Sequence, residues 1–240
     1  MRIAMWSGPR NLSTAMMYSF GSRTDCSVVD EPFYGAYLAM TGLDHPMRSE
    51  IIETCETDPQ RVIEGLIGSN TGNFPHFYQK HMTQHMIAGI DRGWMKQVKN
   101  VFLIRHPARV IASYVKKREM PLLADLGFQE QMELYDLAVS FGQVPPVIDS
   151  VDVRKNPKRA LTALCDAIGI PFDARMLSWP AGGHKDDGIW AQHWYGAVHE
   201  STGFAGTEGQ LPELPDQYLP LLQQALPYYQ AMASKSLIKA

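Results

Sequence analysis

The sequence contains little cysteine, and none in a paired arrangement. Its 240 residues include 3 cysteines, Cys26, Cys55 and Cys165, which lie far apart and form no Cys-x-x-Cys motif. An odd and dispersed set argues against a disulfide framework and against a structural zinc site. We therefore expect reduced, buried thiols, as in a cytoplasmic protein.

The sequence also lacks long hydrophobic runs and an excess of charge of one sign. No apolar run approaches the roughly 20 residues that cross a membrane, and the apolar stretch before Ser7 is too short for a signal peptide. The 22 Lys and Arg against 25 Asp and Glu give a formal net charge of -3. We therefore expect neither a membrane nor nucleic acid as a partner, and any anion site has to be local. A homo-oligomer is compatible with this composition.

The length suits one substantial α/β domain. Short apolar runs that end in turn residues predict strands, and stretches of helical period lie between them. Strands are expected at residues 3–6, 26–29, 77–80, 98–104 and 147–148, and helices at residues 13–22, 58–68, 108–118, 129–141, 156–168 and 217–232. This alternation predicts a single domain over residues 1–240, with a mostly parallel central sheet flanked by helices.

The segment 179–215 has no clear period and is rich in Gly, Trp, His and Pro. A loop of this length inside a compact domain is usually functional or disordered. Its aromatic residues, Trp190, Trp194, Tyr195 and Phe204, argue against disorder. We predict a lid or substrate loop here, and the alternative is a surface loop that its aromatic residues tie down.

The first predicted strand runs into a loop and then into a helix, which is the geometry of a phosphate cradle. Unpaired backbone N–H groups and the helix dipole favour an anion at such a helix start. The loop is not a Walker A motif, because Ser13 and Thr14 stand where that motif has Gly and Lys. The alternative is a plain turn in which Ser13 only caps the helix. The candidate anion-binding residues are Ser7, Gly8, Pro9, Arg10, Asn11, Leu12, Ser13 and Thr14.

A second anion site is predicted where the strand at 98–104 ends. Arg105 follows the strand directly, and Ser113 comes eight residues later on the next predicted helix. A guanidinium can bind a phosphate with two parallel hydrogen bonds, and the Ser113 hydroxyl can add a third.

Together these motifs resemble the sulfotransferase family, whose sulfuryl donor is 3′-phosphoadenosine-5′-phosphosulfate. Family members carry a strand that ends in Arg, followed by a helix with Ser at this spacing, and both residues hold the donor's 3′-phosphate. Their first loop holds the 5′-phosphosulfate, and "SGPRNLSTAMM" is similar to its Arg form in bacterial members. The stretch "VDVRKNPKRALTALCDAIGIP" is similar to the Lys/Arg-Asn-Pro helix that closes the family's core. The resemblance covers roughly residues 2–175 and implies a P-loop NTPase-like sulfotransferase fold.

The chain departs from the family pattern at three places. Arg10 replaces the usual Lys of the first loop, and Leu12 replaces its usual Gly. The family's late Gly-rich loop reaches back to the 3′-phosphate, and its nearest counterpart here begins at Gly182 and Gly183. That alignment makes Lys185 a candidate contact to a donor phosphate.

Sulfuryl transfer to an alcohol needs a general base near the acceptor oxygen and a cation near the bridging phosphate, but no metal. His81 follows a predicted strand beside Lys80, which is similar to the Lys-x-His of cytosolic members, where His is the base. Glu31, after the second strand, is the competing candidate, since some bacterial members use Glu from this region. His81 and His85 are also spaced to share a helical face and bind zinc, but a third ligand is missing. The candidate catalytic residues are therefore His81, Glu31, Arg10 and Lys80.

The sequence thus predicts a sulfotransferase that acts on a small-molecule acceptor with 3′-phosphoadenosine-5′-phosphosulfate as co-substrate. Aromatic residues of the late segment suit the wall of an acceptor pocket. Two alternatives stay open, a P-loop kinase of a small molecule and a nucleotide-binding protein that has lost catalysis.

Overall fold

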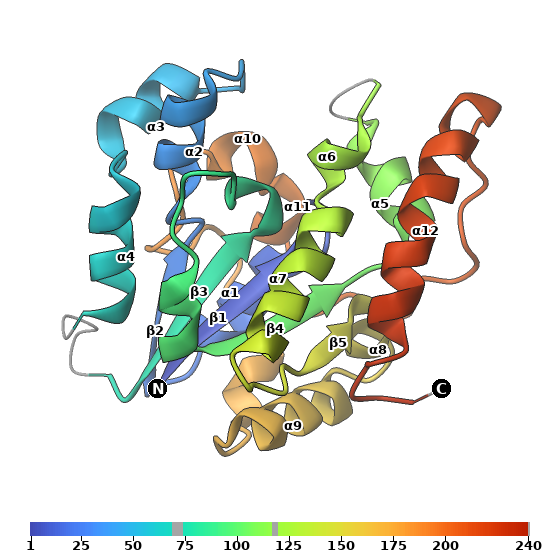
Figure 1. Ribbon diagram of the computed structural model, residues 1–240. Helices are drawn as coiled ribbons and strands as arrows, with labels where there is room; N and C mark the ends of the chain where they lie inside the picture. The colour runs from blue at the N-terminus through green and yellow to red at the C-terminus, as the bar shows by residue number, and fades with distance from the viewer. Residues whose placement is uncertain (69–73, 117–119, 240) are drawn as a thin grey trace.

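The computed structural model describes residues 1–68, 74–116 and 120–239 and shows an α/β fold (Figure 1). Five strands form one sheet in the order β2-β3-β1-β4-β5. All of their pairings are parallel. The strands are β1 Arg2–Ser7, β2 Cys26–Asp30, β3 His76–Met82, β4 Lys99–Ile104 and β5 Val147–Asp149. The predicted fold class, a mostly parallel sheet flanked by helices, is confirmed.

The helices follow the predicted pattern where the sequence shows a clear amphipathic period. The α-helices are α1 Ser13–Gly21, α2 Tyr34–Thr41, α3 Arg48–Thr54, α4 Pro59–Ile67, α5 Pro107–Tyr114, α6 Leu123–Leu126, α7 Phe128–Ser140, α8 Ser150–Lys155, α9 Pro157–Ile168, α10 Ala191–Trp194, α11 Gly196–His199 and α12 Leu219–Ala233. Short 3₁₀ turns are η1 Thr83–His85, η2 Gly93–Gln97, η3 Ala174–Leu177 and η4 Asp216–Tyr218. Of the helix predicted at 108–118, α5 occupies the first part, and residues 117–118 lie outside the described residues.

The predicted helix ranges leave out six α-helices, namely α2, α3, α6, α8, α10 and α11. Helix α2 is buried along its first five residues, so it carries no polar face and no amphipathic period. Helices α3 and α8 have 7 and 6 residues, which is too short to show a period. Tertiary packing, and not local pattern, makes these segments helical.

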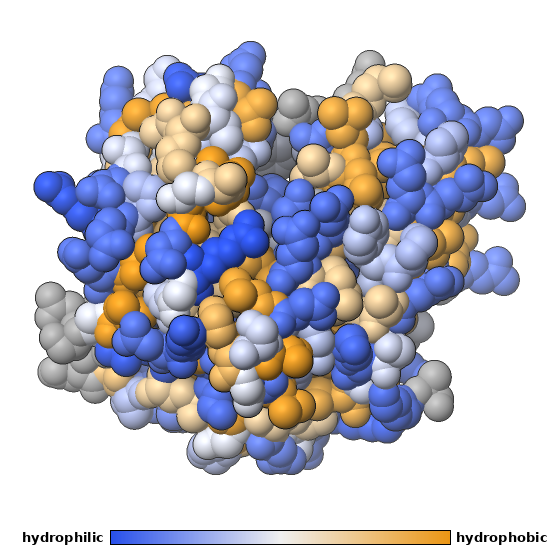
Figure 2. Space-filling model, viewed as in Figure 1, coloured by the Kyte–Doolittle hydropathy of each residue, from blue (hydrophilic) through white to orange (hydrophobic). Residues whose placement is uncertain are grey.

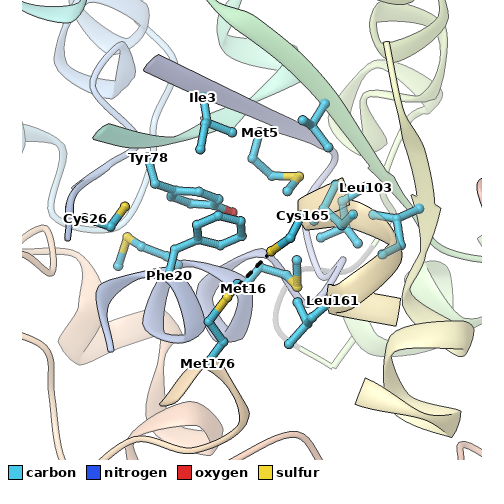
Figure 3. Close-up of a cluster of buried hydrophobic side chains, with 14 of the residues drawn as sticks. Ile3, Met5, Met16, Phe20, Cys26, Tyr78, Leu103, Leu161, Cys165 and Met176 are labelled. Carbon is cyan, nitrogen blue, oxygen red and sulfur yellow. Dashed lines mark hydrogen bonds between the residues drawn. The ribbon is translucent and has the colours of Figure 1, made fainter. Parts of the chain in front are cut away.

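Strand β1 shows why both faces of the sheet are covered. Side chains alternate along a strand, so Ile3 and Met5 point to one face while Ala4 and Trp6 point to the other. On the first face they pack with residues of α1 and α9, and Figure 3 shows this cluster. On the second face they pack with residues of α4, α7 and α12. Because such a parallel strand is buried on both faces, its sequence is a nearly continuous apolar run.

Helices α4 and α9 begin at capping residues in the sequence. The Asp58 side chain accepts a hydrogen bond from the Gln60 backbone N–H, and Pro59 occupies the first turn of α4. Asn156 caps α9 in the same way by accepting from the Arg159 backbone N–H.

The three thiols are free. Cys26 and Cys165 are buried, and Cys55 is half-buried. Burial raises the pKa of Cys165 to about 11, so this thiol stays protonated at neutral pH.

The late segment does not form a separate layer but packs onto the strand ends. Trp190, Ala191 and Tyr195 are buried against residues of α2 and α3. On the face seen in Figure 2, hydrophilic and hydrophobic residues are interspersed. Among the described helices, none is both long and apolar enough to cross a membrane.

Candidate active site

A cavity of about 340 Å³ lies at the carboxyl ends of the strands. It is bordered by the loop after β1, by Glu31 after β2, by Lys80 and Met82 in β3, and by Arg105 after β4. After β1 the chain forms β2 and β3 on one side of β1 in the sheet, and it then crosses over to form β4 on the other side. Loops diverge at such a switch point of a parallel sheet, which leaves a crevice for a ligand.

The first loop contributes residues 9–15 to the cavity wall. A Cβ on Gly8 would collide with the backbone carbonyl of Leu126, so the loop requires glycine there. Arg10 and Leu12 have left-handed backbones, with φ of 59° and 67°. Such angles cost a non-glycine residue about 1 kcal/mol and recur at ligand-binding sites. Ser7 is buried behind the wall and does not border the cavity.

The two predicted anion sites meet in this cavity. Arg10 Nε donates a hydrogen bond to Ser113 Oγ over 2.9 Å, although the two residues are 103 apart in the sequence. Arg105 Nη1 donates to the Arg10 backbone carbonyl over 2.6 Å. The loop after β1 and the β4–α5 junction therefore form one polar wall.

The electrostatics of this wall favour an anion. Burial, and then the charge of Arg105, lower the pKa of Arg10 from its ordinary value. No Asp or Glu within the described ranges forms an ion pair with Arg10. Arg105 Nε is buried and lacks an acceptor among the described residues. An anion bound between these guanidinium groups would relieve their repulsion and satisfy that donor.

A buried ion cluster forms the floor of the cavity beside this wall. Lys80 Nζ lies 2.8 Å from Asp30 Oδ1 and 2.7 Å from Glu31 Oε1. The Lys80 and Asp30 side chains are each 1% exposed, whereas Glu31 is 10% exposed and borders the cavity. Burial alone would lower the pKa of Lys80, but the two carboxylates raise it above its ordinary value. Lys80 is therefore a fixed cation, and Glu31 is the carboxylate within reach of a ligand.

The model of the sulfotransferase domain family matches residues 1–236. The chain belongs to this family. Two curated relatives from Arabidopsis thaliana align with nearly the whole of this chain. Branched-chain-amino-acid aminotransferase-like protein 1 is 38% identical over 97% of this chain and 41% of its own length. Branched-chain-amino-acid aminotransferase-like protein 2 is 36% identical over 95% of this chain and 40% of its own length. The chain thus spans about two fifths of these relatives.

Solved structures of the family share the fold. The sulfotransferase domain from the curacin biosynthetic pathway is 17% identical, covers 95% of this chain and 97% of its own, and superposes with a TM-score of 0.57. The sulfotransferase domain of the Synechococcus PCC 7002 olefin synthase is 18% identical, covers 95% of this chain and 94% of its own, and superposes with a TM-score of 0.52. These likenesses confirm the fold of a sulfotransferase domain.

The structure separates the two candidate bases of this sulfotransferase-family chain. His81 is 1% exposed, stacks on Trp6 with ring centroids 4.5 Å apart, and does not border the cavity. Burial lowers its pKa to about 3. The reason is strand alternation, because Lys80 points to the cavity and His81 therefore points to the opposite face. The family's Lys-x-His spacing falls on Met82, which does border the cavity.

The late segment reaches the predicted second anion site through Glu208 and not through Lys185. Lys185 has a side chain that is 83% exposed, pairs with Asp186 over 3.1 Å and does not border the cavity. Glu208 instead reaches back, and its carboxylate is 3% exposed. It pairs with Arg105, with Arg109 over 3.3 Å and with Arg154 over 3.0 Å. A carboxylate in this loop thus orders three arginines at the edge of the cavity.

Replacement of Glu208 by Gln should destabilise the protein by about 2 kcal/mol, because three partly buried guanidinium groups would lose their common counter-charge. Thermal or urea unfolding measures the change. The matched control is Glu56→Gln, because Glu56 forms an exposed ion pair with Arg61 over 3.9 Å and should cost less than about 0.5 kcal/mol. Equal stability of the two variants would contradict the structural role of Glu208.

Several cavity residues were not predicted from the sequence. Tyr34, His45 and His85 border the cavity. His85 is 3% exposed and its ring stacks on Tyr34 and on Tyr37, with centroids 4.7 Å apart in both pairs. Burial lowers the pKa of His85 well below its ordinary value, so the ring is neutral. The sequence feature that could have indicated this aromatic cluster is the Tyr-x-x-Tyr spacing of Tyr34 and Tyr37 at the start of α2.

The predicted zinc alternative has no counterpart in the described part of the chain. His81 faces the core and His85 faces the cavity, so they do not share a face. Residues 1–68, 74–116 and 120–239 contain no group of three or more His, Cys, Asp or Glu that could hold a metal ion.

Proposed function

We propose that this chain transfers a sulfuryl group from 3′-phosphoadenosine-5′-phosphosulfate to a small-molecule acceptor. The observation that carries the proposal is the joining of Arg10, Ser113 and Arg105 into one polar wall next to Glu31. One cavity thereby combines an anion-binding wall with a carboxylate that can accept a proton.

The donor's two charged ends fit the two parts of this wall. Arg105 and Ser113 would hold the 3′-phosphate, in keeping with the unsatisfied Nε of Arg105. Arg10, Ser13 and Thr14 would hold the 5′-phosphosulfate at the start of α1, where backbone N–H groups and the helix dipole add positive potential. Family membership supports this donor.

In the proposed reaction the acceptor oxygen attacks sulfur while the S–O bond to the 5′-phosphate breaks. The acceptor's proton passes to the Glu31 carboxylate, and adenosine 3′,5′-bisphosphate leaves. Negative charge grows on the bridging oxygen, and the fixed charge of Arg10 stabilises it. Lys80 holds Glu31 in place over 2.7 Å.

The acceptor would bind where the cavity wall is aromatic. Tyr34, Tyr114, Trp194 and Phe204 border the cavity and come from four separate segments. Rings of this kind suit a small organic molecule with an apolar body and one hydroxyl group.

Replacement of Arg105 by Ala should weaken adenosine 3′,5′-bisphosphate binding by about 2 kcal/mol, roughly 30-fold, through the loss of charge-assisted hydrogen bonds. Binding of adenosine 5′-monophosphate, which lacks the 3′-phosphate, should change little. Isothermal titration calorimetry measures both. Arg61→Ala is the control, since that side chain is 72% exposed. Equal losses for the two nucleotides would remove Arg105 from the 3′-phosphate site.

A nucleotide panel followed by a turnover assay tests the function itself. Adenosine 3′,5′-bisphosphate should raise the melting temperature more than ATP with Mg²⁺ does. Labelled donor with a panel of small alcohols, phenols and amines should then give a labelled product. Stabilisation by ATP with Mg²⁺ alone would favour a kinase. Binding of the bisphosphate without turnover on any acceptor would favour a non-catalytic protein.

A further inference from the structure

Tyr195 lies at the centre of the buried ion cluster, although it comes from the late segment between α10 and α11. Its hydroxyl is 2.9 Å from Asp30 Oδ1, 2.8 Å from Asp30 Oδ2 and 3.2 Å from Glu31 Oε1. Lys80 Nζ donates to the same hydroxyl and lies 4.6 Å from the centre of the ring. Tyr195 is 6% exposed and borders the cavity.

Each hydrogen-bond donor of this cluster has an acceptor within the cluster. The three N–H groups of Lys80 have three acceptors, namely Asp30, Glu31 and the Tyr195 hydroxyl. That hydroxyl also accepts from Trp190 Nε1 over 3.0 Å, so its own proton goes to a carboxylate. Burial, and then the charges of Asp30 and Glu31, raise the pKa of Tyr195 well above its ordinary value. The hydroxyl therefore remains a donor at any working pH.

Two carboxylates compete in this cluster for one ammonium group. Asp30 is the more buried of the two and takes hydrogen bonds from Lys80, Tyr195 and the Gly188 backbone N–H. Without the tyrosine hydroxyl, Asp30 would draw Lys80 towards itself, and Glu31 would lose part of its ion pair. A weaker ion pair makes the ionised form of a carboxylate less favourable.

We infer that Tyr195 is a positioning residue, which keeps Lys80 shared between Asp30 and Glu31 and thereby holds Glu31 ionised and oriented. The inference rests on the proposed role of Glu31 as the base. The hydrogen bonds of Glu31 with Lys80 and Tyr195 both involve Oε1, and Oε2 is the oxygen that would take the acceptor's proton. The backbone at Glu31 has φ of 39°, so the loop holds this residue in a left-handed conformation.

The charged and titratable groups near Glu31 come from five segments. Asp30 belongs to β2 and Lys80 to β3, while Tyr195 comes from the late segment. Tyr34 of α2 interacts electrostatically with Glu31, and His85 of η1 interacts with Lys80 and is neutral. Lys80 and the Tyr195 hydroxyl both lie within hydrogen-bond distance of Asp30 and of Glu31. The hydroxyl is the one to remove, because its loss leaves the charge of Lys80 and the aromatic ring in place.

The test is Tyr195→Phe, which keeps the ring and removes only the hydroxyl. At pH 7, kcat/KM should fall about tenfold, because Glu31 would lose its fixed orientation towards the acceptor. As a separate effect, the acidic limb of the pH profile should move up by about one unit, because a lost charge-assisted hydrogen bond shifts a carboxyl pKa by about that much. Binding of adenosine 3′,5′-bisphosphate should not change, which shows that the variant is folded. Trp190→Phe, which removes the donor to the hydroxyl, should shift the limb in the same direction by less. Tyr135→Phe is the control, because Tyr135 is buried outside the cavity.

A second readout keeps this test separate from the proposed function. The ionisation of Glu31 can be followed by carbon NMR of protein labelled at glutamate carboxyls, with Glu31→Gln to assign the signal. Glu31 should titrate at higher pH in Tyr195→Phe than in the wild type, whether or not an acceptor is turned over. An unchanged titration in a folded variant would overturn the inference. A shifted titration with no turnover by the wild type would retain it and reject the proposed function.

Discussion

Replacement of Glu31 by Gln should lower kcat by about 10²–10⁴-fold, because the amide cannot accept the acceptor's proton. The affinity for adenosine 3′,5′-bisphosphate should stay close to that of the wild type, since Glu31 lies on the floor of the cavity and not in the arginine wall. Steady-state kinetics with labelled donor and nucleotide titration by calorimetry measure the two effects. A loss of both properties would indicate a damaged fold, and intact turnover would exclude Glu31 as the base.

The companion variant His81→Phe separates the two candidate bases. His81 stacks on Trp6 and lies outside the cavity, so a phenyl ring can replace its packing. The hydrogen bond to Gln79 Oε1, 3.2 Å long, is the contact that the change removes. We expect a small loss of stability and near wild-type turnover. A folded His81→Phe protein without turnover would return the role of base to His81.

Replacement of Arg10 by Ala should lower kcat by about 10²–10³-fold, because the charge that develops on the bridging oxygen would lose a fixed cation. Binding of the product bisphosphate should weaken much less, since interactions that strengthen in the transition state act on the rate. Pre-steady-state measurement of the transfer step, together with calorimetry, distinguishes the two. Arg105→Ala provides the contrast, as its main effect is on binding.

Arg175→Ala serves as a neutral control for Arg10→Ala. Its side chain is 54% exposed and pairs with Asp173 at a distance from the cavity. If Arg10→Ala changed product affinity and rate by the same factor, Arg10 would contribute uniform binding and have no special role in the transfer step.

The late segment shows how far aromatic content alone can predict structure. The sequence correctly indicated an ordered segment, since Trp190 and Tyr195 are buried against α2. It did not indicate which residues face the cavity, because no period exists in this stretch to define a face. Whether the segment opens and closes as a lid stays a prediction.

Local sequence pattern was sufficient for the mostly parallel sheet and for the two segments that form the polar wall. Apolar runs predicted the five strands, and parallel strands bring their carboxyl ends to one edge. The loop after β1 and the Arg105–Ser113 junction each lie at a strand end, and the observed strand order, with β4 next to β1, makes them neighbours. The family followed from the same motifs.

Only the tertiary structure decided the remainder of the site. The direction of a side chain on β3 depends on strand register, and a shift of one residue exchanges Lys80 and His81 between the cavity and the core. The contacts of Tyr195 to Asp30 and of Glu208 to Arg105 join residues 165 and 103 positions apart. Pairings over such distances leave no periodic trace in the sequence, because they arise from how the late segment packs across the strand ends and not from its local conformation.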